Sequence, residues 1–306
     1  MTQSSGDPLP VTIIGGYLGS GKTTLINHLL NSADGCKYAV LVNDFGELSI
    51  DAQLIESQDG DVISLSGGCV CCSYGNDLTS ALMELNTDNI DQVVIEASGV
   101  ALPGSIAGSL SLLQGFVTSS VVVLADSSTI ETHATDKYLA DTIERQLQSA
   151  DVIAINKVDL SEDEQLNRIE SRINDNYPSA RLIRVSHANY PLGLFVVDTP
   201  QSVADRFAGN SAGESHQTSI YTSFVLDLPG EYDVQELAGK LTDKAMGVLR
   251  AKGFVRDAGG IMQTLQIVGN RSTVRRAPDG VSAGMVCIGL SAECSEEMVK
   301  SALKLQ

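Results

Sequence analysis

An eight-residue stretch near the start of the chain, GYLGSGKT at 16–23, combines three glycines with a lysine, a serine and a threonine. It fits the pattern GxxxxGK[ST], and it lies between the apolar run VTII and the amphipathic run TTLINHLL. Glycines let successive backbone N–H groups turn toward a phosphate, and the start of a helix adds a favourable dipole. We therefore expect a strand, a phosphate-binding loop and a helix here, in preference to an ordinary glycine-rich turn.

Each polar side chain of this loop can bind a different part of a nucleoside triphosphate. Lys22 is expected to neutralise the β- and γ-phosphates, the Thr23 hydroxyl to bind Mg²⁺, and Thr24 to reach the α-phosphate. Catalysis is predicted to depend on Lys22 and Thr23. The residues expected to line the phosphates are Gly16, Gly19, Ser20, Gly21, Lys22, Thr23 and Thr24.

A second motif, Asn156-Lys157-Val158-Asp159, follows the apolar run DVIAI in the pattern NKxD. Guanine offers two adjacent donors that one carboxylate can accept together, whereas adenine has an acceptor at N1. Asp159 is therefore predicted to select guanine, Asn156 to tie the loops together, and Lys157 to lay its stem along the base. An isolated NKxD could simply end a strand, but downstream of a phosphate-binding loop it indicates GTP or GDP as the ligand.

Two further segments place carboxylates after apolar runs. QVVIEASG ends on Glu96, with Gly99 three residues later, and VNDFGELSID offers Asp44 and Glu47. In many P-loop enzymes an acid at a strand end holds Mg²⁺, and a nearby glycine donates its N–H to the γ-phosphate. Glu96, as a third catalytic residue, and Gly99 are predicted in these roles. A helix cap is the alternative for Glu96, and turn chemistry is the alternative for the two loop acids.

Three of the six cysteines, Cys69, Cys71 and Cys72, crowd into the sequence GGCVCC. The chain shows neither a secretory signal nor an apolar run of membrane length, so we expect a cytoplasmic protein whose thiols stay reduced. Metal binding or redox chemistry is then favoured over disulfides. A Cys-x-Cys pair suits Zn²⁺ or another soft transition metal. A reactive thiol cluster, or a turn without metal, is the alternative.

Three sulfurs leave a tetrahedral zinc ion one ligand short, which suits a site that must hand its ion on. Asp44, Glu47, water or a client protein could supply the fourth position, and either acid could instead serve Mg²⁺. His133 is the better candidate for a ligand among the four histidines, although we favour surface placement for it.

The order of apolar and amphipathic segments predicts an α/β protein. Val- and Ile-rich runs alternate with stretches of helical period as far as residue 207, which indicates a P-loop domain with a mostly parallel sheet flanked by helices. The composition of residues 208–219 is that of a linker. We expect a smaller α+β domain over 220–306, with an antiparallel sheet, a helix over 233–250 and a strand over 253–257.

Charge narrows the range of partners. The chain carries 38 acidic and 20 basic side chains, a net charge of −18. Such a charge repels nucleic acid and anionic lipid at long range, so neither nucleic acid nor a membrane is an expected partner. We favour solubility or adaptation to salt as the reason for this acidity.

Six segments of the chain resemble, in their order and spacing, the motifs of the CobW-like GTPases, relatives of the GTPases that insert nickel into hydrogenase and urease. They are GGYLGSGKTTLINHLL, NDFGE, GGCVCC, EASG, RQLQSADVIAINKVDL and RAKGF. The resemblance implies a P-loop GTPase domain with a CobW-type C-terminal domain. It implies a slow GTPase that acts as a metallochaperone or metal-insertion factor, most often for zinc, with the CxCC motif central to metal binding. The implied cofactors are GTP, Mg²⁺ and Zn²⁺, and the implied partner is a client metalloprotein. A homodimer is one of the assemblies that the sequence allows.

Two other functions share some of these features. A P-loop phosphotransferase such as a nucleoside kinase would use the same phosphate loop, but the NKxD motif and the lack of an evident acceptor lid argue against it. A zinc sensor or buffer would bind metal without regard to nucleotide. In the favoured reading GTP and Mg²⁺ order the loop over 44–51 and the cysteine loop into one state, and hydrolysis releases it.

Substitution of Asp159 by asparagine tests the guanine assignment. Asp159→Asn should weaken binding of GTP and favour xanthosine triphosphate, because xanthine carries a carbonyl where guanine carries its N2 amine. Calorimetric titration measures both affinities. Wild-type protein that bound ATP as tightly as GTP would contradict the assignment.

Overall fold

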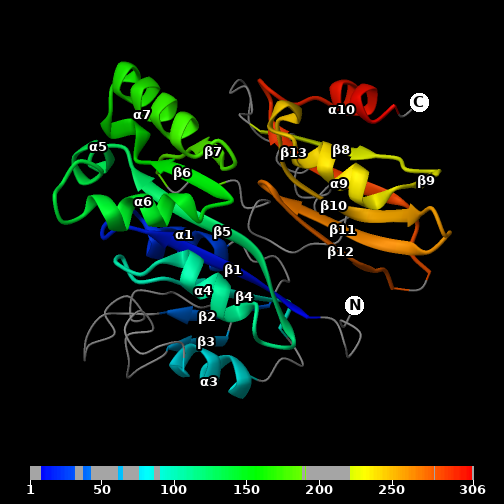
Figure 1. The fold of residues 1–306 in the computed structure, drawn as a ribbon, viewed down its shortest axis with the longest axis horizontal. Coiled ribbons are helices and arrows are strands. Elements are labelled where there is room, and N and C mark those ends of the chain that lie inside the picture. Colours follow the sequence, from blue (N-terminus) through cyan, green and yellow to red (C-terminus); the bar gives the residue numbers. More distant parts are fainter. Residues whose placement is uncertain are drawn as a thin grey trace. The chain divides into compact units, whose positions relative to one another are not determined.

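A computed structural model of the chain describes residues 8–31, 37–42, 61–64, 76–85, 90–187, 190, 221–278 and 280–304; for 61–64, 76 and 77 it describes the backbone alone. The chain divides into two compact units, residues 1–195 and 196–306, and each contains its own sheet (Figure 1). The predicted linker over 208–219 lies outside the described residues and stays a prediction.

The first unit is built on a seven-stranded sheet in the order β3-β2-β4-β1-β5-β6-β7, in which every neighbouring pair is parallel. The strands are β1 (Leu9–Gly16), β2 (Tyr38–Val42), β3 (Asp61–Ser64), β4 (Gln92–Glu96), β5 (Phe116–Asp126), β6 (Val152–Asn156) and β7 (Arg181–Arg184). The helices are α1 (Lys22–Asn31), α3 (Asn76–Glu84), α4 (Pro103–Leu110), α5 (Ile130–His133), α6 (Ala140–Gln148) and α7 (Asp163–Asn176), with a short 3-10 helix η1 (Val158–Leu160).

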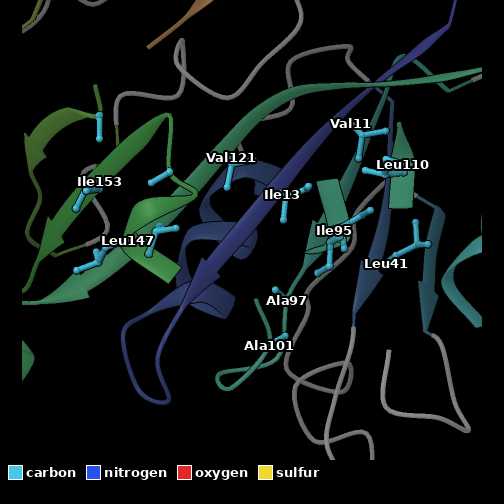
Figure 2. Close-up of a cluster of buried hydrophobic side chains, with 14 of the residues drawn as sticks. Val11, Ile13, Leu41, Ile95, Ala97, Ala101, Leu110, Val121, Leu147 and Ile153 are labelled. Atoms are coloured by element: carbon cyan, nitrogen blue, oxygen red, sulfur yellow. The ribbon is translucent and has the colours of Figure 1, made fainter. Parts of the chain in front are cut away.

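The core of the first unit joins this sheet to α3, α4, α6 and α7. Strand residues such as Ile13 and Ile153 pack with Leu110 of α4 and Leu147 of α6 in one buried cluster (Figure 2). Ile14 points to the other face of the sheet and is also fully buried. Each buried Ile or Leu contributes about 1.5–3 kcal/mol relative to exposure, so burial on both faces holds the strands in register.

The second unit is a six-stranded sheet with two helices. The strand order is β12-β11-β10-β13-β8, all antiparallel, and the short β9 pairs in parallel with β10. The strands are β8 (Tyr221–Leu226), β9 (Glu231–Tyr232), β10 (Val248–Asp257), β11 (Met262–Val268), β12 (Arg271–Arg276) and β13 (Gly284–Leu290). The helices are α9 (Val234–Thr242) and α10 (Glu296–Leu303), with a short 3-10 helix η3 (Lys244–Met246).

Helices α9 and α10 pack onto one shared core of the second unit. Leu237 and Leu241 of α9 and Val299 of α10 lie in the same buried cluster as Leu265 of β11 and Cys287 of β13. The fold class expected from the sequence, a parallel α/β sheet plus a smaller α+β unit, is confirmed. In the part of the chain that the structure describes, no helix has the length and apolar character needed to cross a membrane.

The expected helix over 233–250 is wrong at its C-terminal end. α9 ends at Thr242, and β10 begins at Val248, so the predicted strand over 253–257 is the second half of a ten-residue strand. Asp243 has an extended ψ of 129°, and its carboxylate accepts a hydrogen bond from the backbone N–H of Ala245 at 2.9 Å. Gly247 then adopts a φ of 62°, which favours glycine. This local turn competes with the helical pattern and stops it.

Candidate functional site

The carboxyl ends of four neighbouring strands meet at one edge of the first sheet. β1 lies between β4 and β5, with β6 next to β5, and Ile14 of β1 is level with Glu96 of β4. Asp126 at the end of β5 is level with Asn156 at the end of β6. In a doubly wound sheet this edge, where the strand order reverses, is where ligands bind.

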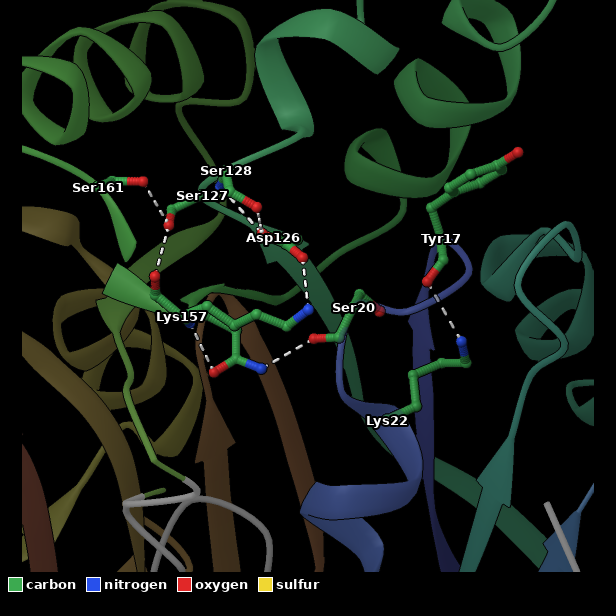
Figure 3. Close-up of polar contacts among 9 residues, drawn as sticks. Tyr17, Ser20, Lys22, Asp126, Ser127, Ser128, Lys157 and Ser161 are labelled. Atoms are coloured by element: carbon green, nitrogen blue, oxygen red, sulfur yellow. Dashed lines mark hydrogen bonds and ion pairs between the residues drawn. The ribbon is translucent and has the colours of Figure 1, made fainter. Parts of the chain in front are cut away.

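The GYLGSGKT segment connects β1 to α1 at this edge. Gly16 ends β1, Gly19 lies at an open position of the loop, and Lys22 is the first residue of α1. The Lys22 Nζ donates to the backbone oxygen of Gly16 at 3.1 Å, and the lysine is only 7% exposed. It also donates to the backbone oxygen of Tyr17 at 3.4 Å (Figure 3). A mostly buried ammonium group beside a helix N-terminus provides an electrostatic site for an anion.

Two glycines are required here by close approach of other groups. Gly21 has a φ of 101°, and a Cβ on it would overlap the side-chain amide of Asn156. A Cβ on Gly99, in the loop after β4, would come within 2.8 Å of the backbone nitrogen of Leu18. Gly99 therefore packs directly against the phosphate loop. This cradle of close backbone contacts fits a phosphate chain, since N–H groups can reach it without side chains in the way.

Thr23 and Glu96 meet on the other side of the loop. The Thr23 Oγ1 donates to Glu96 Oε1 at 3.0 Å, and Glu96 is 2% exposed at the end of β4. A hydroxyl and a carboxylate oxygen within one hydrogen bond of each other fit Mg²⁺, which takes such ligands in P-loop sites. Thr24, the next residue of α1, is exposed.

Asn156 joins the two nucleotide motifs. Its Nδ2 donates to the backbone oxygen of Ser20 at 2.8 Å, and its Oδ1 accepts the backbone N–H of Lys157 at 2.9 Å. Asn156 is 6% exposed, and its bond to Ser20 is shielded from water. The structure thus brings together the phosphate loop and the NKxD segment, which are far apart in the sequence.

Asp126 holds Lys157, a contact that the sequence analysis did not anticipate. The Lys157 Nζ lies 2.7 Å from Asp126 Oδ2, while Asp126 Oδ1 accepts hydrogen bonds from the Ser128 backbone at 2.9 Å and hydroxyl at 2.6 Å (Figure 3). Burial alone would raise the pKa of the Asp126 carboxyl. The hydrogen bonds from Lys157 and Ser128 and the charge of Lys157 outweigh burial and hold that pKa below its ordinary value. The sequence does contain a signal for Asp126, because an acidic residue directly after the apolar run VVVLA is expected at the end of a buried strand.

Ser127 fixes the segment that carries Asp159. The Ser127 Oγ donates to the backbone oxygen of Lys157 at 2.8 Å and accepts the hydroxyl of Ser161 at the same distance. These bonds hold both ends of the 3-10 helix η1, in which Asp159 lies with its side chain 31% exposed. His187 Nε2 is 3.6 Å from Asp159 Oδ2. Asp159 is therefore at the same edge as the phosphate loop and open to a ligand.

Two histidines near this edge pack against aromatic rings. His133 is half-buried, and its ring meets that of Tyr17 edge to face with 4.8 Å between centroids. The ring of His28 lies 6.3 Å from the ring of Tyr190. Burial lowers the pKa of His28, while a hydrogen bond to the Tyr190 backbone opposes that shift. Tyr190 is buried close to Gly21, a position that the sequence analysis missed.

The predicted metal ligands Cys69, Cys71, Cys72, Asp44 and Glu47 lie outside the described residues. Within the described ranges, no three His, Cys, Asp or Glu side chains gather in a way that could hold a metal ion. Cys287 and Cys294 are buried in the second unit, and burial raises the pKa of the Cys287 thiol. The zinc site at residues 69–72 stays a prediction.

Two protein-family models match the chain. Residues 10–184 match the nucleotide-binding domain described as CobW/HypB/UreG. Residues 221–304 match the domain described as the cobalamin synthesis protein cobW C-terminal domain. The two matches cover the described part of both units apart from their ends.

Individual proteins are similar over most of the chain. The zinc chaperone CobW of Pseudomonas aeruginosa is 31% identical, across 86% of this chain and 81% of its own length. The zinc chaperone YjiA of Escherichia coli is 33% identical, across 81% of this chain and 82% of its own length. A crystal structure of Zn(II)-bound YjiA GTPase from E. coli aligns over 97% of this chain and 98% of its own, with 24% identity and a TM-score of 0.46.

The Asp126–Lys157 pair predicts a pH-dependent stability difference. Because the carboxyl pKa is lowered in the folded protein, its contribution is complete above the ordinary value of 3.8 and is lost as the pH falls through the lowered value. Asp126→Asn should therefore reduce the free energy of unfolding near neutral pH by about 0.5–1 kcal/mol, a modest value because Lys157 is 36% exposed. The difference in free energy of unfolding between wild type and Asp126→Asn, measured by urea unfolding, should shrink below pH 3.8.

A matched control is Asp141→Asn, which removes an exposed partner of Arg145 on α6 at 3.7 Å. Its effect should be close to zero at every pH. A difference between Asp126→Asn and wild type that stays constant from neutral to acid pH would contradict the assignment of the stabilisation to the carboxylate.

Proposed function

Because the chain belongs to the CobW/HypB/UreG family of nucleotide-binding proteins, we propose that it binds and slowly hydrolyses GTP and acts as a metallochaperone that delivers zinc to a client protein. The observation that carries the nucleotide part is the hydrogen bond from Asn156 Nδ2 to Ser20 O at 2.8 Å. It joins a phosphate loop to a base-recognition motif at one sheet edge, as a nucleotide with both a base and a phosphate chain requires.

Recognition of guanine rests on Asp159 in this proposal. Its partly exposed carboxylate would accept the N1–H and N2 amine of the base together, an arrangement that adenine cannot match. Lys157, held at its ammonium by Asp126 and at its backbone oxygen by Ser127, would present its stem to the face of the base. Both side chains thus depend on contacts from the end of β5.

Hydrolysis is the transfer of the γ-phosphoryl group from GTP to water, with GDP as the leaving group. Lys22 would neutralise the β- and γ-phosphate oxygens, and the Gly99 N–H would donate to the γ-phosphate. Thr23 and Glu96 would hold Mg²⁺, which supplies further charge neutralisation at these oxygens when it is bound. The sequence has no evident arginine finger, so turnover without a partner should be slow.

Zinc is the proposed cargo because relatives at 31% and 33% identity are named zinc chaperones. Cys69, Cys71 and Cys72 are the proposed ligands, since thiolates suit Zn²⁺. The segment that carries them follows β3, which ends at Ser64 and runs parallel to β2. The carboxyl end of β3 therefore lies at the same edge as the phosphate loop, which supports coupling between metal and nucleotide.

Lys22→Ala tests the hydrolytic part of the proposal. The variant should lose GTP turnover by about 100-fold or more, because the phosphate charge is no longer neutralised, while circular dichroism and thermal unfolding stay close to wild type. Lys137→Ala is the matched control, since Lys137 is an exposed lysine over the ring of Tyr138 and lies outside the 16–23 segment. Phosphate release by Lys22→Ala at the wild-type rate would exclude the loop as the hydrolytic site.

Cys71→Ala tests the metallochaperone part. Zinc affinity, measured by competition with a chromophoric chelator, should differ between the GDP form and a non-hydrolysable GTP form by about 5- to 150-fold, the usual range for coupled sites. Cys71→Ala should lower zinc affinity and abolish that difference while leaving GTP affinity in metal-free buffer unchanged. Cys294→Ala, a substitution in the core of the second unit, should leave zinc affinity unchanged.

Two results would favour the other candidate functions. Identical zinc affinities in the two nucleotide forms would indicate a zinc sensor or buffer that is independent of nucleotide. Transfer of the phosphoryl group to a molecule other than water, seen by product analysis, would indicate a phosphotransferase.

A further inference from the structure

A glutamine on α6 makes a pair of hydrogen bonds to the loop that follows β4. The Gln146 Nε2 donates to the backbone oxygen of Gly99 at 3.1 Å and to that of Ala101 at 2.8 Å. Gln146 is 1% exposed, and Gly99 and Ala101 are buried. The amide group has two hydrogens, so each of these two carbonyl oxygens can receive one of them.

The same loop is held from its opposite side by the phosphate loop. A Cβ on Gly99 would come within 2.8 Å of the Leu18 backbone nitrogen, so the two backbones are in close contact there. Gln146 and Leu18 also line one small cavity together with Ser20 and Asp126. Gly99 is thus clamped between the phosphate loop and α6, one residue beyond Ser98 and three beyond Glu96.

We infer that Gln146 is a positioning residue that fixes the Gly99 N–H for the γ-phosphate and thereby sets the preference of the protein for GTP over GDP. The inference rests on the proposed function. A planar amide that holds the carbonyls of Gly99 and Ala101 restrains the Gly99–Val100 and Ala101–Leu102 peptide units. The Gly99 N–H belongs to the preceding unit, whose Ser98 oxygen accepts the Ala101 N–H at 2.9 Å, so the held turn also sets the direction of that N–H. GDP has no γ-phosphate, so loss of this restraint must affect GTP more than GDP.

Gln146 differs from an ordinary buried polar residue in what it contacts. If Gln146 served only to satisfy hydrogen bonds in the core, its substitution would lower folding stability. The affinities for GTP and GDP would then change by the same factor or stay unchanged. Here both acceptors lie in one loop that contacts the phosphate loop, so the expected effect is on one ligand. The ratio of GTP affinity to GDP affinity therefore separates a positioning role from a structural one.

Gln146→Met and Gln148→Met test the inference in the full-length protein with Mg²⁺. Methionine has a similar length and fills the space, but it has no donor. Gln148 is exposed on the same helix, which makes it the matched control. Calorimetric titration should show that Q146M lowers the affinity for a non-hydrolysable GTP analogue by about tenfold. The affinity for GDP should fall by less than about twofold. Q148M should change neither affinity.

The other possible results separate failure of this inference from failure of the proposed function. Equal weakening of both nucleotides by Q146M, or an affinity ratio equal to that of wild type, would overturn the inference and leave the proposed GTPase intact. Wild-type protein that bound neither nucleotide would overturn the proposed function, and the inference with it. If thermal unfolding shows that Q146M does not fold, Gln146→Leu, which also lacks a donor and places no charge beside the two carbonyl oxygens, replaces it and is read in the same way.

Discussion

The parallel pairing of β1 with β4 on one side and β5 on the other is the constraint on which the site depends. Because parallel strands end at the same edge, the loop after β1 is brought beside Glu96, Asp126 and Asn156, the last residues of β4, β5 and β6. Burial of both faces of the sheet prevents a shift of register, since a slip by one residue would turn each strand's side chains to the wrong face. The chemistry at the edge is therefore as fixed as the core beneath it.

Electrostatics at this edge differ from those of the whole chain. The net charge of −18 would repel a nucleotide at long range, but exposed charges beyond about 8–10 Å are largely screened at physiological salt. Close to the loop, the Lys22 ammonium and the start of α1 present positive charge in a site that is mostly buried. Asp126 is neutralised by Lys157, and Glu96 accepts a hydrogen bond from Thr23. An acidic protein can thus hold an anionic ligand locally.

Side chains that reach across the edge join the loops into one unit. Asn156 connects the loop after β6 to the phosphate loop, Ser127 connects the loop after β5 to η1, and Gln146 connects α6 to the loop after β4. A change at any of these loops must alter hydrogen bonds that are shielded from water and costly to leave unmade. This network joins the loops after β1, β4, β5 and β6, so a ligand bound at one of them acts on the others through direct contacts.

The sequence alone determined the elements whose signal is local. The glycine pattern of 16–23 and the NKxD segment each lie between an apolar run and a helix or turn, so their place at strand ends followed from spacing and backbone sterics. The helix over 233–250 was predicted wrongly because Asp243 and Gly247 make a turn whose strength a periodic pattern does not express. Only the tertiary structure decided which distant side chains meet. Lys157 and Asp126 are 31 positions apart, and Gln146 and Gly99 are 47, and neither pair has a spacing that marks it. Their contacts exist because strand order places separate loops at one edge, and strand order depends on packing of the whole sheet.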